Sequence, residues 1–524
     1  MNDPVAVCAM EHVAEMLALR VSTSRQLGAD PELVLYGGGN TSLKADWHAP
    51  GLATHACLYV KGSGTDLAQV TEADFTPLAL APVRALLDGP PLGNEALMAA
   101  IEPHKLDPAA PRPSIETLLH AGLPHACVDH THADAVLALV NTVNGAALAQ
   151  EVFGDLAPLV PFQRSGFALA KTCQTVWQRR ATPRTIGLIL HQHGAVSMGE
   201  DAAQSRLHML RLADLARRHL EAHRAWALPR ATPAPRGPEG ALALARLRGE
   251  LSAAAGFPLL LAVDNSPEAM GFAHRPDVAH LSAGPATAQH AVFTKGRALC
   301  DGDVGAWSRA YRALLAANTP SGWPAATLPD AAPRIVVDRR FGIAAASVDA
   351  AHAAMSARVF QHGFAIASRA AAHDRFLPMD PVEALLAELY YGGFEHALRE
   401  RARRDAPLTG AVVVLEPERS AAAALLEHLG AAVVVAAGAQ PEALERAVTE
   451  ACWRHGGADA LVSPAAPAAH CRQVLDASPL AAAWFDTAGA GAAHGRYEPV
   501  RGLSAERLAA ALARRLGLAL AAAA

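Results

Sequence analysis

The chain contains, at residues 126–132, the stretch Ala-Cys-Val-Asp-His-Thr-His. Its apolar beginning is typical of the end of a buried strand. On an extended strand, side chains at positions i and i+2 leave the same face of the sheet. We therefore expect His130 and His132 to point the same way, close enough to share one bound ion.

A third histidine has to come from another part of the chain. The apolar run 186–190 predicts a second strand, which would deliver His191 and His193 by the same geometry. Three neutral imidazoles with an open position are the ligand set of a catalytic zinc rather than of a closed structural one. The chain holds 24 histidines, so a chance His-x-His pattern is the alternative to a metal site. The neighbouring segments are needed to choose between these two interpretations.

Two glycine-rich loops follow predicted strands. Residues 33–36 are expected to form a strand that runs into Gly37-Gly38-Gly39-Asn40-Thr41-Ser42, and residues 57–61 one that runs into Gly62-Ser63-Gly64-Thr65-Asp66. Glycines at strand ends let the backbone approach an anion closely, and N–H groups with Asn and Ser side chains supply donors. An ordinary tight turn is the alternative for either loop alone.

A short helix is predicted in the segment 113–120. Ser114 would cap it, Glu116 would lie in its first turn, and Leu118 and Leu119 would form its buried face. The carboxylate of Glu116 has two interpretations. It either interacts with the helix dipole or acts as a general acid/base beside the metal.

Taken in order, five motifs resemble the class II aldolase/adducin family. They are Gly-Gly-Gly-Asn-Thr-Ser (37–42), Lys-Gly-Ser-Gly-Thr-Asp-Leu (61–67), Ser-Ile-Glu-Thr-Leu-Leu-His (114–120), Asp-His-Thr-His-Ala-Asp-Ala (129–135) and His-Gly-Ala-Val-Ser-Met-Gly (193–199). The likeness covers residues 1–225 and is closest to the long bifunctional rhamnulose-1-phosphate aldolase/alcohol dehydrogenases. It implies an α/β fold, with an α/β/α sandwich around a largely antiparallel sheet, and active sites at the subunit contacts of a homotetramer.

The resemblance also implies roles for individual residues. Glu116 would be the catalytic acid/base, and the ligands of a divalent metal, most simply Zn²⁺, would be His130, His132 and His193. The substrate phosphate would be bound by Gly39, Asn40, Ser63, Gly64 and Ser114. His191 stands where the smaller aldolases usually have another residue, so it would at most support the ligands. Ile115 stands where they often carry a second serine.

The expected chemistry needs these residue types together. Cleavage of a ketose 1-phosphate leaves an enediolate, whose negative charge a metal stabilises as a Lewis acid. A glutamate moves the proton on and off the carbanionic carbon, and phosphate contacts hold the reacting carbons in place. Pentulose-phosphate epimerases of the family tend to have aspartate at this position, so Glu116 favours cleavage over epimerisation.

Composition indicates a cytoplasmic enzyme without specifying its reaction, and the family resemblance implies a small sugar phosphate as its partner. The length of 524 residues predicts two or three domains, and the net charge of −5 gives no basic stripe for nucleic acid. We expect no signal peptide and no membrane span. Seven scattered cysteines without a C-x-x-C pair indicate reduced thiols: Cys8, Cys57, Cys127, Cys173, Cys300, Cys452 and Cys471.

Three domains are expected along the chain. A helix over residues 201–223 closes the aldolase-like domain 1–225, and the proline-rich stretch 228–238 forms a boundary. Residues 239–400 resemble the middle segment of the long family members. There Gly284-Pro285-Ala286-Thr287-Ala288-Gln289-His290 echoes a family Gly-Pro-x-Thr-Pro-Asp-His motif, for which we expect a structural turn, with a ligand or proton carrier at His290 as the alternative.

The last domain, residues 405–524, is predicted to be a shortened Rossmann-like βαβαβ unit. Strands are expected at 411–415, 432–436 and 458–462, with helices at 420–429 and 442–455. A short-chain dehydrogenase would place a glycine-rich turn after its first strand, but here Glu416-Pro417-Glu418-Arg419 follows. A Tyr-x-x-x-Lys pair is also missing, since Arg501 stands four residues after Tyr497. We expect a dehydrogenase remnant that does not use NAD and whose surviving role is packing or assembly.

The sequence thus predicts a metal-dependent lyase that cleaves a phosphorylated ketose to dihydroxyacetone phosphate and an aldehyde. One alternative keeps the same site for another sugar-phosphate reaction, such as epimerisation, dehydration or decarboxylation. A second is a non-catalytic scaffold, as adducin-type members of the family are.

Overall fold

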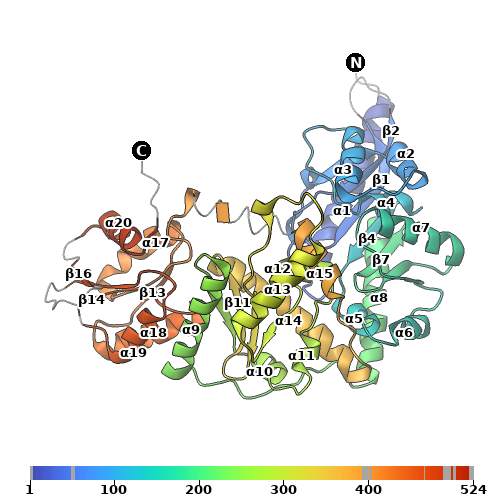
Figure 1. Cartoon of the computed structure of the whole chain (residues 1–524). Helices are drawn as coiled ribbons and strands as arrows, with labels where there is room; N and C mark the ends of the chain where they lie inside the picture. Colours follow the sequence, from blue (N-terminus) through green and yellow to red (C-terminus); the bar gives the residue numbers. More distant parts are fainter. Residues whose placement is uncertain are drawn as a thin grey trace. The chain divides into compact units, whose positions relative to one another are not determined.

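The computed structural model describes residues 4–48, 54–391, 399–400, 404–464, 466–487, 497–499 and 503–518. It divides into two compact units (Figure 1). Unit 1 comprises residues 1–228 and 365–377, and unit 2 comprises residues 229–364 and 378–524. The first boundary falls in the proline-rich stretch 228–238. The three-domain division predicted from the sequence stays a prediction.

Unit 1 is built on a seven-stranded sheet with the order β3-β2-β1-β4-β7-β6-β5. All neighbouring pairs are antiparallel except β5 and β6, which run parallel. The strands are β1 (Asn40–Trp47), β2 (His55–Lys61), β3 (Phe75–Ala79), β4 (Cys127–Thr131), β5 (Leu159–Val160), β6 (Gly187–Leu190) and β7 (Gly194–Gly199). This mixed α/β unit with a largely antiparallel sheet agrees with the expected fold class.

Helices cover both faces of this sheet. One face packs against α1 (Pro4–Gly28), α5 (Asp134–Val140) and α8 (Ala202–Ala222). The other packs against α2 (Leu80–Ala85), α4 (Thr117–Gly122) and α7 (Phe167–Arg180), with α3 (Asn94–Ile101) in the same core. The remaining helix of this part is α6 (Gly145–Val152). Helix α8 confirms the helix that was predicted over residues 201–223.

The alternation of side chains along β4 separates two clusters. Asp129 points toward α1, where its carboxylate lies 2.6 Å from Nη1 of Arg20, and both side chains are fully buried. The next residue, His130, points to the opposite face, toward the start of α4. Asn40 on β1 pairs directly with His130 in the register of the sheet. The pleat therefore places an amide beside the candidate metal ligand.

One strand predicted from the sequence is wrong. Residues 33–36 form no strand: Leu33 and Tyr36 lie in turns, and the carbonyl of Asp30 accepts hydrogen bonds from the N–H groups of both Leu33 and Val34. Tyr36 then takes a positive φ of 37°, which no strand residue adopts. The sheet begins only at Asn40. The apolar side chains in this segment fill the core without extending the backbone.

Unit 2 begins with a four-stranded sheet of order β8-β11-β10-β9. Its strands are β8 (Leu260–Asp264), β9 (Leu299–Cys300), β10 (Ile335–Asp338) and β11 (Gly342–Ser347). Its helices are α9 (Pro238–Ala255), α10 (Pro267–Ala273), α11 (Val278–Leu281), α12 (Ala288–Thr294), α13 (Val304–Asn318), α15 (Pro381–Tyr391) and the first part of α14 (Ala350–His373).

The motif 284–290 has a structural explanation, although its end forms a helix rather than the expected turn. Gly284 lies so close to Met379 that a Cβ atom would come within 2.5 Å of the Met379 carbonyl oxygen. Thr287 caps α12, and its hydroxyl lies 3.0 Å from Nδ1 of His290. Burial lowers the pKa of His290 to about 3, so this ring is neutral and belongs to the helix start.

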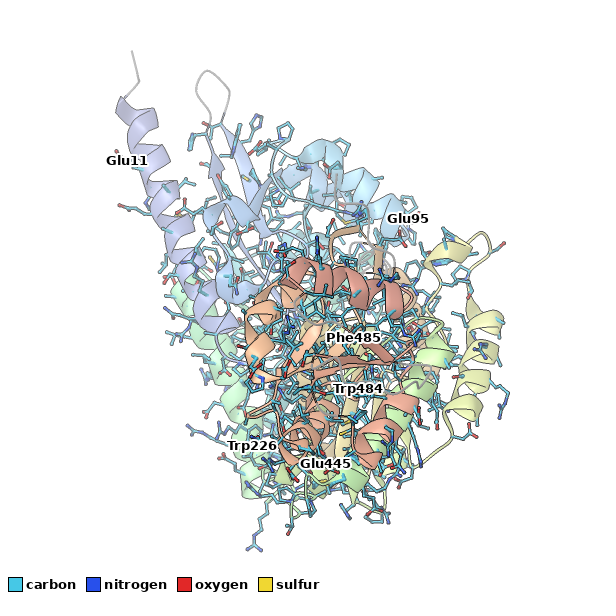
Figure 2. The ribbon with its side chains drawn as sticks, turned by 90° about the vertical axis from the view of Figure 1, so that its left-hand side faces the viewer. Glu11, Glu95, Trp226, Glu445, Trp484 and Phe485 are labelled. Atoms are coloured by element: carbon cyan, nitrogen blue, oxygen red, sulfur yellow. The ribbon has the colours of Figure 1, made fainter. Side chains whose placement is uncertain are left out.

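The last sheet of unit 2 is fully parallel, with the order β13-β12-β14-β15-β16. Its elements are β12 (Val412–Leu415), α17 (Ala423–His428), β13 (Ala432–Val435), α18 (Pro441–His455), β14 (Ala460–Ser463), α19 (Ala469–Asp476), β15 (Ala483–Asp486), β16 (Tyr497–Pro499) and α20 (Ala505–Arg515). In β15, Phe485 is buried and its neighbour Trp484 is half-buried (Figure 2), with the indole N–H donating to Ser463. The predicted βαβαβ alternation is confirmed.

The strand order differs from a Rossmann half-motif. There the third strand extends the sheet beyond the second, whereas here β14 pairs with the other edge of β12. The segment after β12 begins a short 3₁₀ helix at Pro417, and the buried Glu416 donates its N–H to Val462. Arg501 of the missing Tyr-x-x-x-Lys pair lies outside the described residues.

A continuous core joins the two sheets of unit 2. It contains residues of β8 and β11 together with residues of β12, α9 and α18. The fully buried Arg248 of α9 ion-pairs with Asp459 at 2.8 Å and donates to the carbonyl of Gly410. Among the helices within the described ranges, none is long and apolar enough to cross a membrane.

Candidate metal centre

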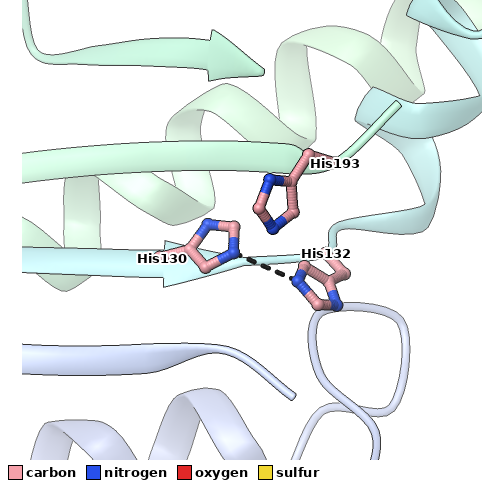
Figure 3. A group of neighbouring side chains, drawn as sticks. All are labelled: His130, His132 and His193. Atoms are coloured by element: carbon pink, nitrogen blue, oxygen red, sulfur yellow. Dashed lines mark hydrogen bonds between the residues drawn. The ribbon is translucent and has the colours of Figure 1, made fainter. Parts of the chain in front are cut away.

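Three histidines meet at one end of the unit 1 sheet (Figure 3). His130 is near the end of β4, His132 follows the strand, and His193 lies in the turn between β6 and β7. One ring nitrogen of each lies within 4.8 Å of those of the others. The Nε2 atoms of His130 and His132 are 3.1 Å apart. Two nitrogens bound tetrahedrally to one zinc would be about 3.3 Å apart, so the rings are already near ligand spacing.

His193 does not reach the cluster by strand geometry. Strand β6 ends at Leu190, and residues 191–193 form a tight turn in which Gln192 has a φ of 55°. The turn separates the directions of the two histidines. Burial lowers the pKa of His191, and His191 is not part of the cluster identified among the described residues.

The protonation state of His130 suits a metal ligand. Its Nδ1 lies 3.0 Å from the carbonyl oxygen of Ala195, so this nitrogen carries the hydrogen and Nε2 keeps its lone pair. Burial lowers the pKa of His130 to about 4. A neutral imidazole whose second nitrogen is fixed by a carbonyl is the form that binds a metal ion.

Glu116 faces the same nitrogens. Its Oε1 lies 3.0 Å from Nε2 of His193, and its Oε2 lies 3.6 Å from Nε2 of His130. Burial alone would raise the pKa of Glu116, but His130, His193 and the amide of Asn40 together hold it well below its usual value. A buried, ionised carboxylate beside three imidazoles is a donor set that attracts a divalent cation.

A chain of hydrogen bonds orients this carboxylate. The amide of Asn40 donates to Oε2 of Glu116 over 2.6 Å, and its oxygen contacts Nε2 of His120. The other ring nitrogen of His120 lies 2.8 Å from the hydroxyl of Ser42. Burial lowers the pKa of His120 to about 3. The neutral ring therefore donates to Asn40 and accepts from Ser42, which fixes the amide nitrogen toward Glu116.

The helix after Ser114 starts later than predicted. It begins at Thr117, with Glu116 at the N-cap position. The hydroxyl of Ser114 accepts the N–H of Glu116 over 3.2 Å, and its carbonyl accepts the N–H of Thr117 over 3.0 Å. Leu118 and Leu119 are buried as expected. Ser114 thus holds the backbone that presents Glu116, one step before the helix.

The two glycine loops expected to bind phosphate lie side by side. A Cβ atom on Gly37 would be 3.5 Å from the carbonyl oxygen of Gly64, and one on Gly39 would be 2.8 Å from that of His130. Gly64 has a positive φ of 81° and open space in front of it. The N–H of Ser63 donates to the carbonyl of Arg112 over 2.8 Å, and Ser63 is exposed.

Two further polar residues escaped the sequence analysis. The hydroxyl of Ser165 lies 3.1 Å from Oε1 of Glu116. It comes from an irregular loop before α7, and no pattern in the sequence marks it. Lys61 is buried and donates to the carbonyl of Thr65 over 2.6 Å, which shapes the second glycine loop. Burial lowers the pKa of Lys61 to about 8. Its position directly before the loop was the available signal.

Two family models match separate parts of the chain. Residues 19–220 match the model described as Class II Aldolase and Adducin N-terminal domain. This part of the chain belongs to the class II aldolase/adducin family. Residues 239–397 match a further model of this group, described as Aldolase class II, second domain. Class II aldolases use a divalent metal ion, and the His130, His132 and His193 cluster lies inside the first matched region.

Similar proteins match the N-terminal part. An uncharacterized oxidoreductase, YuxG, of Bacillus subtilis (strain 168) is 35% identical over 183 residues, which are 34% of this chain and 26% of that protein. The chain thus spans about a quarter of the length of this relative. The solved class II aldolase domain of a conserved Thermoplasma acidophilum protein is 30% identical over 38% of this chain and 91% of that one, with a TM-score of 0.36. The L-fuculose-1-phosphate aldolase of Thermus thermophilus is 17% identical over 41% and 96%, with a TM-score of 0.27.

Proposed function

We propose that this protein is a metal-dependent aldolase that cleaves a ketose 1-phosphate to dihydroxyacetone phosphate and an aldehyde. The substrate class we propose is a deoxyhexulose 1-phosphate of the rhamnulose type. The observation that carries the proposal is the position of Glu116. Its ionised carboxylate lies within 3.0 Å of His193 and 3.6 Å of His130, so an acid/base and a metal-ligand set share one site.

His130, His132 and His193 would hold the ion, which we propose to be Zn²⁺. When bound, the ion supplies positive charge next to the oxygens of the substrate on which negative charge develops. The neutral state of His130 supports this role, because a protonated imidazole has no lone pair to offer.

Glu116 would move the proton. Cleavage of the carbon–carbon bond leaves a carbanionic carbon that has to gain a proton before dihydroxyacetone phosphate is released, and the reverse reaction removes that proton. The carboxylate is held by the amide of Asn40 and the hydroxyl of Ser165 at distances of 2.6 and 3.1 Å. These two hydrogen bonds fix the orientation of the carboxylate, which is what proton transfer to one carbon requires.

The substrate phosphate would lie against the glycine loops, with contacts from Gly39, Asn40, Ser63, Gly64 and Ser114. The open space in front of Gly64 allows close approach of an anion to the backbone. The amide of Asn40 already donates to Glu116 over 2.6 Å and to the hydroxyl of Ser114 over 3.4 Å, so its share in phosphate binding would require the longer bond to Ser114 to be exchanged for one to the phosphate.

For the rest of the protein, we propose the long bifunctional architecture with a C-terminal part that does not act as a dehydrogenase, since its strand order is not that of a Rossmann half-motif. The buried Glu416 after β12 would repel the pyrophosphate of NAD, so NAD is not part of the proposal. We further propose a cytoplasmic homotetramer, as the family resemblance implies. Cleavage rather than epimerisation is favoured by a glutamate at position 116.

Metal analysis and a product assay test the proposal. The purified protein should carry about one divalent ion per chain, and it should release dihydroxyacetone phosphate from one or more members of a panel of ketose 1-phosphates. Chelation should abolish the release, and added Zn²⁺ should restore it. A metal-free protein that cleaves no member of the panel would refute the proposal. Another product from the same panel would identify a different reaction of the same site.

A further inference from the structure

A segment from the second matched region lies in unit 1, beside the turn that carries His193. Helix α14 ends at His373, and residues 374–377 belong to unit 1, although the second family model spans residues 239–397. We call residues 374–377 the strap. The strap contacts the loop between α5 and α6, which lies next to that turn.

The strap pairs with this loop along its whole length. The N–H of Val143 donates to the carbonyl of Arg375 over 3.0 Å, and the N–H of Leu377 donates to the carbonyl of Asn141 over 2.8 Å. Phe376, which is 1% exposed, lies between these bonds and forms an antiparallel bridge with Thr142. At the outer end, the carboxylate of Asp374 accepts two hydrogen bonds from Asn144.

Gln192 connects the strap to the metal site. Its side-chain Nε2 donates to the carbonyl of Leu377 over 3.1 Å, and its backbone N–H donates to Oδ1 of Asn141 over 3.2 Å. Together with the bond from Leu377 to Asn141, these contacts form a closed ring of three hydrogen bonds. Gln192 is only 8% exposed, so water competes little for its donors.

The turn needs such support for a physical reason. Gln192 takes a φ of 55°, a left-handed conformation that residues other than glycine adopt at a cost. The backbone conformation at Gln192 sets the direction in which His193 leaves the turn.

We propose that the strap is a built-in positioning element of the metal centre and that Gln192 is its positioning residue. The second matched region then has a role in unit 1: it supplies the main-chain groups that hold His193 at ligand distance. This inference rests on the proposed function only in so far as His193 is a metal ligand.

The test uses the full chain with Gln192→Met, which keeps the length of the side chain and removes its donor. Gln192→Gly, which accepts the positive φ without strain and lacks the side chain, is the second variant. Gln174→Met is the matched control, because Gln174 lies on α7 and accepts from Lys171 away from the turn. Co²⁺ affinity is measured by competition with a chromophoric chelator, and hydrogen exchange of residues 190–194 is followed in metal-free protein.

We expect both Gln192 variants to bind Co²⁺ about tenfold more weakly and to exchange the amides of the turn about tenfold faster. Gln174→Met should match the wild type in both measurements. If the amide exchange of the turn and the Co²⁺ affinity were both unchanged in the two Gln192 variants, the positioning role of the strap would be refuted. The hydrogen exchange is measured without metal, so it tests the positioning role of the strap independently of metal binding. A wild-type protein that fails to bind Co²⁺ would refute the proposed function but would leave this test of the strap intact.

Discussion

The side-chain amide of Asn40 donates to Glu116 over 2.6 Å, and the two residues are 76 positions apart in the chain. Asn40 belongs to β1 and Glu116 to the start of α4, so only the folded sheet brings them together. His120 orients the amide from its other side. Asn40 thus orients the acid/base of the candidate site, and His120 in turn orients Asn40.

This relationship predicts the effect of His120→Leu. The substitution leaves the amide oxygen of Asn40 and the hydroxyl of Ser42 without their buried partner, which should cost about 2 kcal/mol of stability. Dihydroxyacetone phosphate release should also fall, because the amide can then turn away from Glu116. Denaturant unfolding and kcat are the measurements. Ser42→Ala, which removes only the hydrogen bond between Ser42 and His120, should lose less activity. Equal losses of activity in the two variants would contradict the orienting role of His120.

Glu116→Gln should separate catalysis from scaffolding. The amide keeps the shape of the side chain but cannot accept a proton, so cleavage should fall by a factor of about 10²–10⁴. Circular dichroism and size-exclusion chromatography should match the wild type. Glu102→Gln is a suitable control, because the exposed carboxylate of Glu102 pairs with Lys105 and lies outside the candidate site. Full activity in Glu116→Gln would assign the proton transfer to another group.

Metal removal should destabilise unit 1 through the histidine cluster. An ion that binds only the folded state adds about 4 kcal/mol when its concentration is a thousand times Kd. Chelation should therefore lower the Tm of the wild type, whereas His132→Ala should show little zinc after dialysis and no response to chelator. Differential scanning calorimetry and elemental analysis measure both effects. His125→Ala, at a histidine outside the cluster, should behave as the wild type.

The buried ion pair beneath the site predicts a large loss of stability in Arg20→Met. This substitution leaves the carboxylate of Asp129 without its cation in a fully buried position, which typically costs about 3–5 kcal/mol. Thermal unfolding of the full chain gives the comparison. Arg218→Met, whose side chain is 74% exposed in the wild type, should change stability by no more than about 0.5 kcal/mol. A small effect of Arg20→Met would show that α1 packs without the pair.

The neutral, buried His290 predicts a pH dependence of unit 2. The pKa is lowered from 6.5 to about 3 by burial and by His362, so below pH 6.5 the unfolded chain binds a proton that the folded chain does not. Stability is therefore fully present above pH 6.5 and falls as the pH drops toward 3. Between pH 7 and pH 5 the wild type should lose about 2 kcal/mol more than His290→Gln. Denaturant unfolding at the two pH values measures both losses. If the wild type and His290→Gln lost the same stability, a group other than His290 would be responsible for the pH dependence.

The local patterns of the sequence were reliable where one physical factor dominated. The apolar runs of the C-terminal part predicted the parallel strands β12, β13 and β14, because a strand buried on both faces has no polar alternation. Residues 33–36 are apolar too, but a turn around Asp30 prevails there. The hydrophobic pattern alone does not show whether a strand or a turn forms there, because the outcome depends on which backbone groups find hydrogen-bond partners.

For the candidate site, the sequence determined that His130 and His132 share a direction, because the alternation along a strand is a local property of the backbone. It also indicated the family through the order of its motifs. Only the tertiary structure decided the rest. The turn at Gln192 aims His193, the register between β1 and β4 sets Asn40 beside His130, and the loop before α7 brings Ser165 to Glu116. These contacts join residues far apart in the chain, so they depend on packing and on hydrogen bonds that no short stretch of sequence contains.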